Sequence, residues 1–533
     1  MITMKTSSNN FKRLLTILVV GILVLSIFVL ILNNQSKAQS DTSKVTLTIK
    51  TLNWFPEDYQ TAYVLQNELQ SVGLNVQLDL EGSNLLYPQV YAQHNFTLYL
   101  NAWSNSPFPS QMFSFFQTWN DYTNGNNIYG FHNSTYDKLT NITEFNSNYT
   151  NFKEGLYEMQ EIIQKNVVVI PLFTDQTLQL LSKNFKGYVP MPGGEFTPYD
   201  IWNILNMTPT TNSTNETFTI DFPSDVQTFN WFDTNNLRDY FVASLIYDSL
   251  VKFSPNMTIV PWLAQNYTIS NDGLTYTFYL RNNVTFSNGM PLTAQDVAFT
   301  YDWALQNKAP YIYPYISMIS NISVINNYTL KFVLSKPYIG LLYEMTEIPI
   351  VPEFQWVNQN ITWANPNPIG SGPFILESRV PGTSLTFIAN PHYWLKGYPK
   401  IKQLNIMIVP DETIRILNME KGVADTELYS TPVDLALNAT KNFPNQLQIV
   451  KSPGIWSVWL MFNLREYPTN DLHLRQAIAY AINRSEIVKN VLQGYGSPQY
   501  GPISSVWSPQ FIPSNLTIYP YNTSLSKSIL QEY

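Results

Sequence analysis

The sequence contains no cysteine and only four histidines. Without cysteine, the chain has no disulfide, no thiolate nucleophile and no zinc site built on paired cysteines. No two histidines have the i, i+4 spacing that would put a pair of metal ligands on one face of a helix; they are His94, His132, His392 and His473. We therefore expect no metal site and no cofactor.

Charged residues are also scarce, at 13% of the chain, against roughly 25% in an average soluble domain. The net charge is −8 and no basic cluster is present, which excludes nucleic acid as a partner. Aromatic residues reach 14%, and polarity comes mainly from Asn, Thr and Ser. At 533 residues the chain exceeds one hydrophobic core, so we expect two or three structural units with room for a cleft.

The N-terminus has the pattern of a membrane anchor. After three basic residues, an apolar or small run from Leu14 to Leu32 comes close to the length that spans a hydrocarbon layer of about 30 Å. A signal peptide cut near Ala38 is the alternative. We predict a cytoplasmic stub, anchor and spacer over 1–41, with the remainder outside the cell. Sequons there predict a glycoprotein, and they include Asn95, Asn133, Asn141, Asn148, Asn212, Asn215, Asn256, Asn266, Asn283 and Asn327.

Hydrophobic periodicity predicts an α/β fold with β-hairpin insertions. Alternation from Val45, helical spacing over 62–72 and renewed alternation over 74–80 indicate a βαβ unit. A helix over 152–164 leads to an apolar strand at 167–170, which Pro171 is expected to close. Residues 207–216 are polar and aperiodic and form the clearest linker, after which the pattern is rich in short strands.

Several long motifs after the linker resemble the family 5 solute-binding proteins of ABC transporters, the oligopeptide- and dipeptide-binding type. The stretch from Pro261 to Trp303, which begins PWLAQNYTISNDGLTYTF, looks like the signature region of that family. Further matches follow in the usual order of the family: NPIGSGPFIL at Asn367, NPHYW at Asn390, KGVAD at Lys421 and FNLREYPTNDLHLRQAIAYAINRSEIV at Phe462. The resemblance implies a two-lobed, periplasmic-binding-protein-like (type II) α/β fold with mixed sheets and a smaller β-rich subdomain.

The segment before the linker resembles the distal half of the same family, which normally comes last. NIYGFHNSTYDKL at Asn127, LYEMQEIIQKNVVVIPLF at Leu156 and NFKGYVP at Asn184 carry this likeness. We therefore expect a circular permutation; a fused gene fragment is the alternative. The domains would then be the distal half at 42–206, the linker at 207–216 and the proximal half at 217–533.

The resemblance also assigns these segments to lobes. The first lobe would combine 217–255, 370–450 and 166–206, with the β-rich region at 256–369 packed onto it. The second lobe would combine 456–533 with 42–165. Two crossing segments, near 450–456 and near 165–168, would form the hinge.

By the same resemblance, the chain would be the binding subunit of an importer and not an enzyme. It would close on an oligopeptide or oligosaccharide and deliver it to ABC permease subunits with their associated ATPase, and we expect a monomer held at the membrane by its N-terminal helix. No GxxxxGK[ST] motif is present, in keeping with ATP hydrolysis by other chains.

The resemblance further suggests the ligand-binding residues. Peptide-binding members read W-x-x-D at the position of Trp103, and the Asp pairs with the amino group of the peptide; here Ser106 takes that place. A buried ammonium without a carboxylate would cost several kcal/mol, which favours a neutral, hydroxyl-rich ligand. The predicted ligand-binding residues are Trp103, Ser104, Ser106, Trp231, Trp456, Trp459 and Asn463. For each tryptophan, plain core packing is the alternative.

Two other functions remain open from the residues alone. An extracellular glycoside hydrolase would suit the aromatic residues, but it needs two carboxylates that flank a sugar bond, and acidic residues are sparse. A surface-layer or adhesion protein would suit the anchor and the sequons, but it predicts internal repeats, and none is evident.

Overall fold

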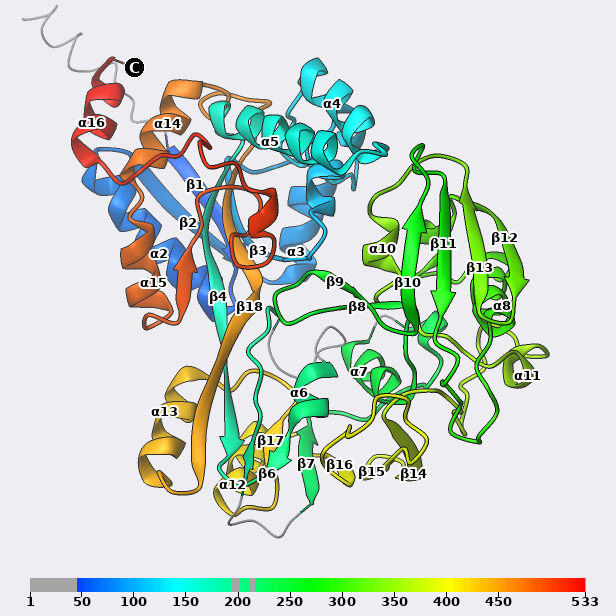
Figure 1. Ribbon diagram of the computed structural model, residues 1–533. Coiled ribbons are helices and arrows are strands. Elements are labelled where there is room, and N and C mark those ends of the chain that lie inside the picture. The colour runs from blue at the N-terminus through cyan, green and yellow to red at the C-terminus, as the bar shows by residue number, and fades with distance from the viewer. Residues whose placement is uncertain (1–45, 194–200, 211–215, 235, 533) are drawn as a thin grey trace, which may run out of the picture.

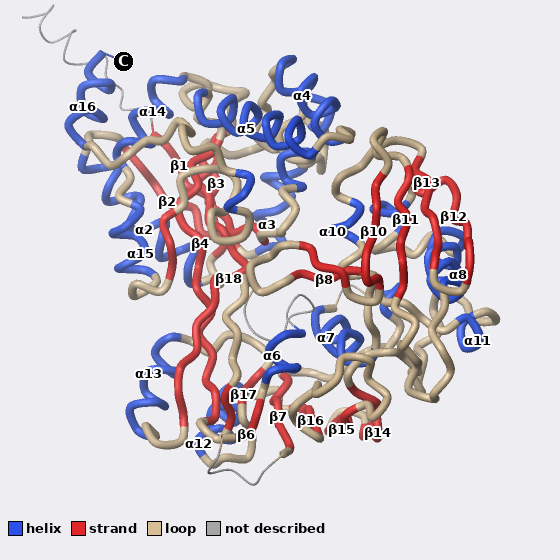
Figure 2. The backbone as a smooth tube through the Cα atoms, in the orientation of Figure 1, coloured by secondary structure: helices blue, strands red, loops and turns tan. Residues whose placement is uncertain are grey.

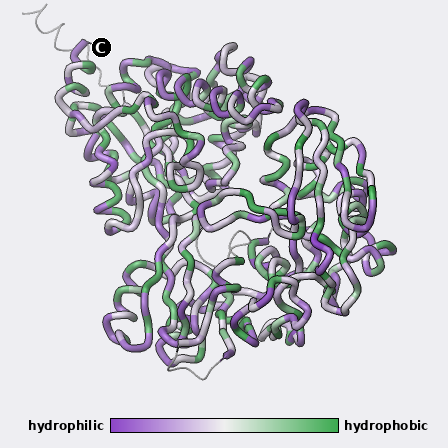
Figure 3. Tube along the Cα trace, viewed as in Figure 1, coloured by the Kyte–Doolittle hydropathy of each residue, from purple (hydrophilic) through white to green (hydrophobic). Residues whose placement is uncertain are grey.

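The computed structural model describes residues 46–193, 201–210, 216–234 and 236–532. The predicted anchor at Leu14–Leu32 lies outside these residues. Hydrophobic and hydrophilic positions alternate along the described chain (Figure 3), and none of its helices combines the length and apolarity needed to cross a membrane. The chain forms three units: two lobes, which lie at the upper left and the bottom of Figure 1, and a β-rich subdomain at the right.

Lobe two is built on a six-stranded mixed sheet with the order β19-β4-β18-β3-β1-β2. The predicted βαβ unit is confirmed: β1 (Thr46–Leu52) and β2 (Asn75–Glu81) are parallel neighbours joined by α2 (Pro56–Ser71). The remaining strands are β3 (Leu98–Ser104), β4 (Val169–Ser182), β18 (Leu447–Phe462) and β19 (Gly496–Pro498).

Helices cover both faces of this sheet (Figure 2). On one face α2 shares a hydrophobic core with α14 (Leu472–Ala481) and α15 (Arg484–Val491). On the other face lie α3 (Ser83–Tyr87), α4 (Ser134–Glu144) and α5 (Tyr149–Lys165), in a core that continues into lobe one and the subdomain. The last helix, α16 (Thr523–Glu532), lies against α14, where Ser526 donates to the carbonyl of Ala477.

Lobe one contains a five-stranded sheet with the order β14-β15-β16-β7-β17. Its strands are β7 (Thr217–Phe222), β14 (Phe374–Val380), β15 (Ser384–Ala389), β16 (Gln403–Ile408) and β17 (Thr426–Glu427). Its helices are α6 (Ile201–Asn206), α7 (Leu237–Ile246), α12 (Glu412–Glu420) and α13 (Val433–Asn442). Two short pairs complete it: β5 (Phe185–Lys186) with β6 (Thr208–Pro209), and β8 (Val251–Phe253) with β9 (Ile259–Pro261).

The β-rich subdomain is a four-stranded antiparallel sheet with the order β10-β11-β13-β12. Gly273 turns the first hairpin with a φ of +69°, a region that favours glycine. Its strands are β10 (Ala264–Ile269), β11 (Thr275–Leu280), β12 (Ile319–Asn326) and β13 (Thr329–Leu334). Its helices are α8 (Ala294–Gln306), α9 (Tyr313–Ile316), α10 (Leu341–Glu344) and α11 (Glu353–Trp356).

Strands β4 and β18 run from lobe two into lobe one as an antiparallel pair. β4 does not end at Pro171, as the sequence suggested. Proline has no NH to donate to the ladder, but the register between β4 and β18 shifts at this point, between Val458 and Trp459, and the strand continues beyond it. Residues 165–168, expected to cross between the lobes, lie at the end of α5 within lobe two. β4 stays in the lobe-two sheet as far as Asp175 and first bonds lobe-one residues at Leu178, so its crossing falls between these positions.

The segments before and after lobe one contribute to the same lobe-two sheet. β1, β2 and β3 come from the first part of the chain, whereas β18 and β19 come from the last part, and β18 bonds directly to β3 over seven residue pairs. Residues 46–165 therefore share both a sheet and a core with residues 456–532.

Candidate functional site

Four of the predicted residues lie where the end of β3 pairs with the middle of β18, beside the crossing point; they are Trp103, Ser104, Trp456 and Trp459. Trp456 pairs with Ser104, and Ser457 pairs with Trp103. Since side chains alternate along a strand, Trp103 and Trp459 share one face of the sheet, whereas Trp456 faces the opposite side. The structure thus brings two of the three predicted lobe-two tryptophans together and separates the third.

Trp103 and Trp459 flank a phenylalanine pair. The ring of Phe115 lies 4.7 Å from that of Trp103 and 6.4 Å from that of Trp459, and Phe116 stacks with Trp459 at 6.5 Å. Among the described residues, neither indole NH has a hydrogen-bond partner, and the same is true of the buried side-chain NH2 of Asn105. Unpaired buried donors are costly, so those of the partly buried residues Trp103 and Asn105 favour an acceptor supplied from outside the chain, whereas Trp459 is 2% exposed and packs in the core.

A network of neutral hydroxyl and amide groups adjoins these donors. Thr174 Oγ1 lies 2.9 Å from Gln499 Oε1 and 3.1 Å from Ser504 Oγ. Ser457 Oγ donates to Gln499 Oε1 at 2.6 Å and lies 2.9 Å from Asn105 Oδ1. The network is buried, holds its members in fixed orientations and contains no ionised group, so it adds no charge beneath the Trp103 surface.

Only one of the two predicted serines borders this surface. Ser104 is exposed at the end of β3 and pairs with Trp456, so it faces the opposite side of the sheet. Ser106 follows β3, and its Oγ accepts a bond from the backbone NH of Phe108 at 3.3 Å. Phe108 then contacts the subdomain, with its ring 5.2 Å from that of Tyr343 and 5.9 Å from that of Tyr338. The segment after β3 therefore connects the lobe-two surface to the β-rich subdomain.

Trp456 lines a separate cavity of about 510 Å³ behind the crossing strands. Its backbone NH donates to Asp175 at 2.9 Å, and its side chain is 40% exposed. Burial raises the pKa of Asp175 to about 7, although the bond from Trp456 opposes that rise. Further walls come from α2, the segment before α13 and the end of α15, so this cavity is bounded by both lobes.

Trp231 and Asn463 lie apart from the Trp103 surface. Trp231 is buried in lobe one against Tyr240, with 4.4 Å between the ring centroids. Asn463 is buried in lobe two, and its amide donates to the carbonyls of His94 and Phe96 at 2.9 and 3.0 Å. Asn463 therefore supports the fold of lobe two, and its donor atoms are occupied by backbone.

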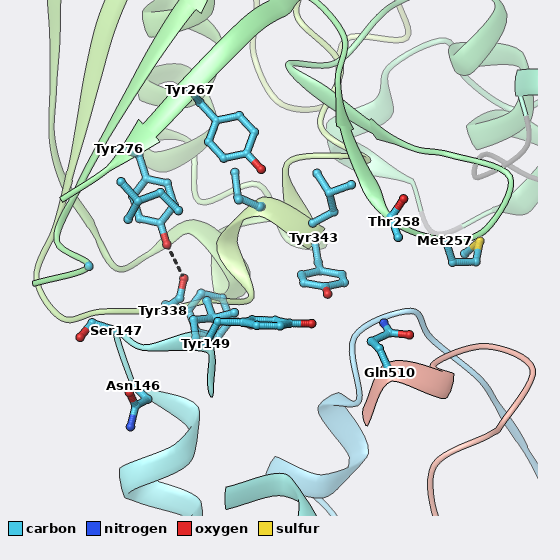
Figure 4. A pocket seen from close by; sticks show the side chains of 15 residues that line it. Asn146, Ser147, Tyr149, Met257, Thr258, Tyr267, Tyr276, Tyr338, Tyr343 and Gln510 are labelled. Carbon is cyan, nitrogen blue, oxygen red and sulfur yellow. Dashed lines mark hydrogen bonds between the residues drawn. The ribbon is translucent and has the colours of Figure 1, made fainter. Parts of the chain in front are cut away.

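Sequence reasoning missed a tyrosine-rich pocket between lobe two and the subdomain (Figure 4). Its volume is about 370 Å³, and its walls come from the α4–α5 loop, the β8–β9 turn, β10, β11, the 338–343 segment and Gln510. Five tyrosines contribute: Tyr149, Tyr267, Tyr276, Tyr338 and Tyr343. The sequence contains one indication of this pocket, its high content of 34 tyrosines, but that content does not show which tyrosines line a common pocket.

Comparison with known proteins identifies the family. A family model described as bacterial extracellular solute-binding proteins, family 5 Middle, matches residues 258–533, more than half of the chain. The nickel-binding periplasmic protein of Escherichia coli K12 is 30% identical over 302 residues, which cover 55% of this chain and 56% of that protein. The dipeptide-binding protein of the same strain is 28% identical over 313 residues, covering 54% and 57% respectively. The chain thus spans little more than half the length of these curated relatives.

Among solved structures, the periplasmic murein tripeptide-binding protein MppA in its unliganded open form is similar with a TM-score of 0.50. The likeness covers 60% of this chain and 66% of that one at 20% identity, and it concerns the fold alone. Two lobes joined by a pair of crossing strands, with a neutral aromatic surface beside the crossing, define a two-lobed binding protein. The chain belongs to the bacterial extracellular solute-binding proteins, family 5.

Family membership confirms the α/β, two-lobed type II fold class that the motifs predicted. The family consists of binding proteins and not enzymes, so the hydrolase reading finds no support, and neither does the surface-layer reading.

Proposed function

We propose that this protein is the extracellular substrate-binding subunit of an ABC importer, which captures a solute by closure of its two lobes and delivers it to membrane permease subunits with their ATPase. The observation that carries the proposal is the pair of crossing strands, β4 and β18, between two lobes of a chain in this family. A solute between the lobes contacts both of them only when they are closed, so its binding energy shifts the open–closed equilibrium.

The surface around Trp103 supports an uncharged solute group at this position. It offers indole rings, amide donors and hydroxyls, and Ser106 stands where a carboxylate would pair with a peptide amino group. An oligopeptide that keeps its charged amino group elsewhere, or an oligosaccharide, suits such a surface. The dipeptide-binding relative favours the peptide, whereas the nickel-binding relative indicates that other solutes occur in the family. Trp103 and Ser106 are the predicted residues that we propose to line the site. Ser104 lies on the opposite face of the sheet, and Trp459 is 2% exposed and packs in the core.

We also propose that the chain is circularly permuted. The two parts of lobe two come from opposite sides of lobe one in the sequence, yet they form one sheet. Beside the linker, β5 lies against β7, with the rings of Phe185 and Phe218 4.9 Å apart, so both ends of residues 207–216 belong to the same lobe. Nearby surface positions of this kind are where rearranged connections are tolerated. A chain with residues 217–533 placed before 46–206 should fold to the same thermal stability within a few degrees; failure to fold would refute the permutation.

The anchor at Leu14–Leu32, an extracellular location and glycosylation remain part of the proposal. The side chains of Asn141, Asn256 and Asn283 are exposed, as a glycan requires.

A screen of the purified chain against peptides and oligosaccharides tests the function. A solute that binds the folded state raises the melting temperature according to RT ln(1 + [L]/Kd). Small-angle scattering should then show a smaller radius of gyration with that solute, whereas Trp103→Ala should weaken its affinity at least tenfold. Binding without any compaction would contradict lobe closure, and turnover of the solute would contradict a purely binding role.

A further inference from the structure

The tyrosine-rich pocket has walls from all three units of the molecule. Lobe two supplies Tyr149 and Gln510, the subdomain supplies Tyr267, Tyr338 and Tyr343, and the β8–β9 turn of lobe one completes the lining. At about 370 Å³, the pocket lies at the lower end of the range for small-molecule sites, roughly 300–1,000 Å³. It is therefore large enough for one ring-bearing group and too small for a long chain.

The pocket presents no charge to a ligand. None of the described residues that line it is acidic or basic. The nearby carboxyl of Glu344 interacts with Tyr338, and burial together with the charge of Glu347 raises its pKa to about 8, so Glu344 is largely protonated at neutral pH. A charged ligand would lose its hydration here without a counter-charge, which costs several kcal/mol. The occupant should be neutral.

The walls are suited to a flat ring with a polar edge. Tyrosine faces and aliphatic groups from Ile259, Ile339 and Leu342 make the greater part of the lining. The hydroxyl of Tyr267 points into the open space, and that of Tyr343 lies within reach of the Gln510 side chain (Figure 4). Aromatic rings pack favourably edge-to-face or offset, and the few polar groups can bind a hydroxyl or ring NH.

We propose that this pocket binds an uncharged aromatic side chain, of the tyrosine or tryptophan kind, carried by the solute. The inference rests on the proposed function, and it adds a specificity site to the Trp103 surface. Phe108 follows that surface in the chain and packs against Tyr338 and Tyr343, so the segment after β3 adjoins both sites. A solute that occupies both sites would pass along this segment.

Occupancy of the pocket should also hold the subdomain against lobe two. The two units already meet beside it: Lys336 lies over the ring of Phe145, 3.3 Å from its centroid, and Gly273 fits so closely that an added Cβ would lie 2.7 Å from the Cβ of Ser147. A ring that touches Tyr149 and Tyr267 together adds contacts that exist only while the units are close, so it binds the closed arrangement preferentially.

The test uses the purified full chain with N-acetyl-tryptophanamide as the probe, observed by saturation-transfer NMR and titration calorimetry. We expect saturable binding, at least tenfold weaker binding of the charged probe N-acetyl-lysinamide, and at least tenfold loss in Ile339→Trp, which fills the pocket. Ile325→Trp is the matched control, because Ile325 is 54% exposed on β12 and outside the pocket; it should bind the probe as the wild type does.

Several results would overturn the inference: no saturable binding, equal binding of both probes, or full binding by an Ile339→Trp chain whose melting temperature is unchanged. If Ile339→Trp fails to fold, Tyr267→Leu replaces it, with an expected loss of about threefold or more. The two proposals fail separately. If a peptide compacts the lobes but the probe does not bind, the importer function is supported and the pocket proposal is refuted. If the probe binds but no solute closes the lobes, the pocket is supported and the importer function is refuted.

Discussion

Asp58 offers a quantitative test of the packing in lobe two. This carboxyl lies in the first turn of α2, fully buried beside the end of β3. Burial, aided by the charge of Glu57, raises its pKa from 3.8 to about 8, and the backbone of Ala102 opposes only part of that rise. In the unfolded chain the carboxyl ionises near pH 4, whereas in the folded protein it keeps its proton. Stability should therefore fall as the pH rises from about 4 to about 8 and level off above that.

The magnitude follows from the pKa difference. Each pKa unit is worth about 1.4 kcal/mol, so the interval from pH 5 to pH 8 removes about 4 kcal/mol of the free energy of unfolding through this one group. Asp58→Asn has nothing to ionise. We expect the stability of the variant relative to wild type to improve by about 4 kcal/mol over the same interval, measured by urea unfolding at several pH values. Other buried carboxyls, such as Glu68, contribute to both chains and cancel.

A matched substitution provides the control. Asp272 is exposed, and hydrogen bonds from Ser270 and Leu274 lower its pKa, so Asp272→Asn should change stability by the same amount at pH 5 and at pH 8. Parallel stability curves for wild type and Asp58→Asn over that range would refute the reasoning, because they would mean that Asp58 ionises in the folded protein as it does in the unfolded chain.

Three further predictions concern stability and the contact between units. Asn463→Leu should lower the free energy of unfolding by about 2–4 kcal/mol, because two backbone carbonyls lose a donor, but should leave solute affinity within twofold; a large affinity loss would make Asn463 a ligand contact. Gly273→Ala should speed hydrogen exchange around Ser147, because alanine is strained at this positive φ and its Cβ would clash with the side chain of Ser147; unchanged exchange would contradict the close fit. Arg415→Met should cost about 3–5 kcal/mol in urea unfolding, because it leaves Glu427 buried without its 2.8 Å ion pair; a loss below 1 kcal/mol would contradict this.

The sequence predicted those elements in which local pattern and tertiary environment agree. The βαβ unit at 46–81 was evident because alternating and helical periods follow one another without interruption. The capping box of α8 is local in the same way, because Thr293 and Asp296 lie three residues apart and both of its bonds form within the first turn. Such features depend on neighbours within a few residues.

Features that depend on distant partners could not be read in the same way. The continuation of β4 past Pro171 requires a register shift on β18, more than 280 residues away along the chain. Trp456 and Trp459 lie on opposite faces because they are three residues apart in one strand, but which of them shares a face with Trp103 follows from the pairing of β18 with β3, which motifs do not encode. The tyrosine pocket joins Tyr149 to Tyr343, and no local spacing connects them.

The ladder between β18 and β4 is interrupted between Pro453 and Ser457, and this interruption has a mechanical consequence. Apart from the second shift between Val458 and Trp459, which lies within lobe two, the two strands are bonded to each other and resist bending, so relative rotation of the lobes should concentrate in these few residues. Gly454 backs directly onto the carboxylate of Asp175 there, which leaves no space for a side chain. In the proposed closure, a joint confined to so short a stretch would allow rotation about essentially one axis, so each lobe would move as a rigid body and present the same geometry each time.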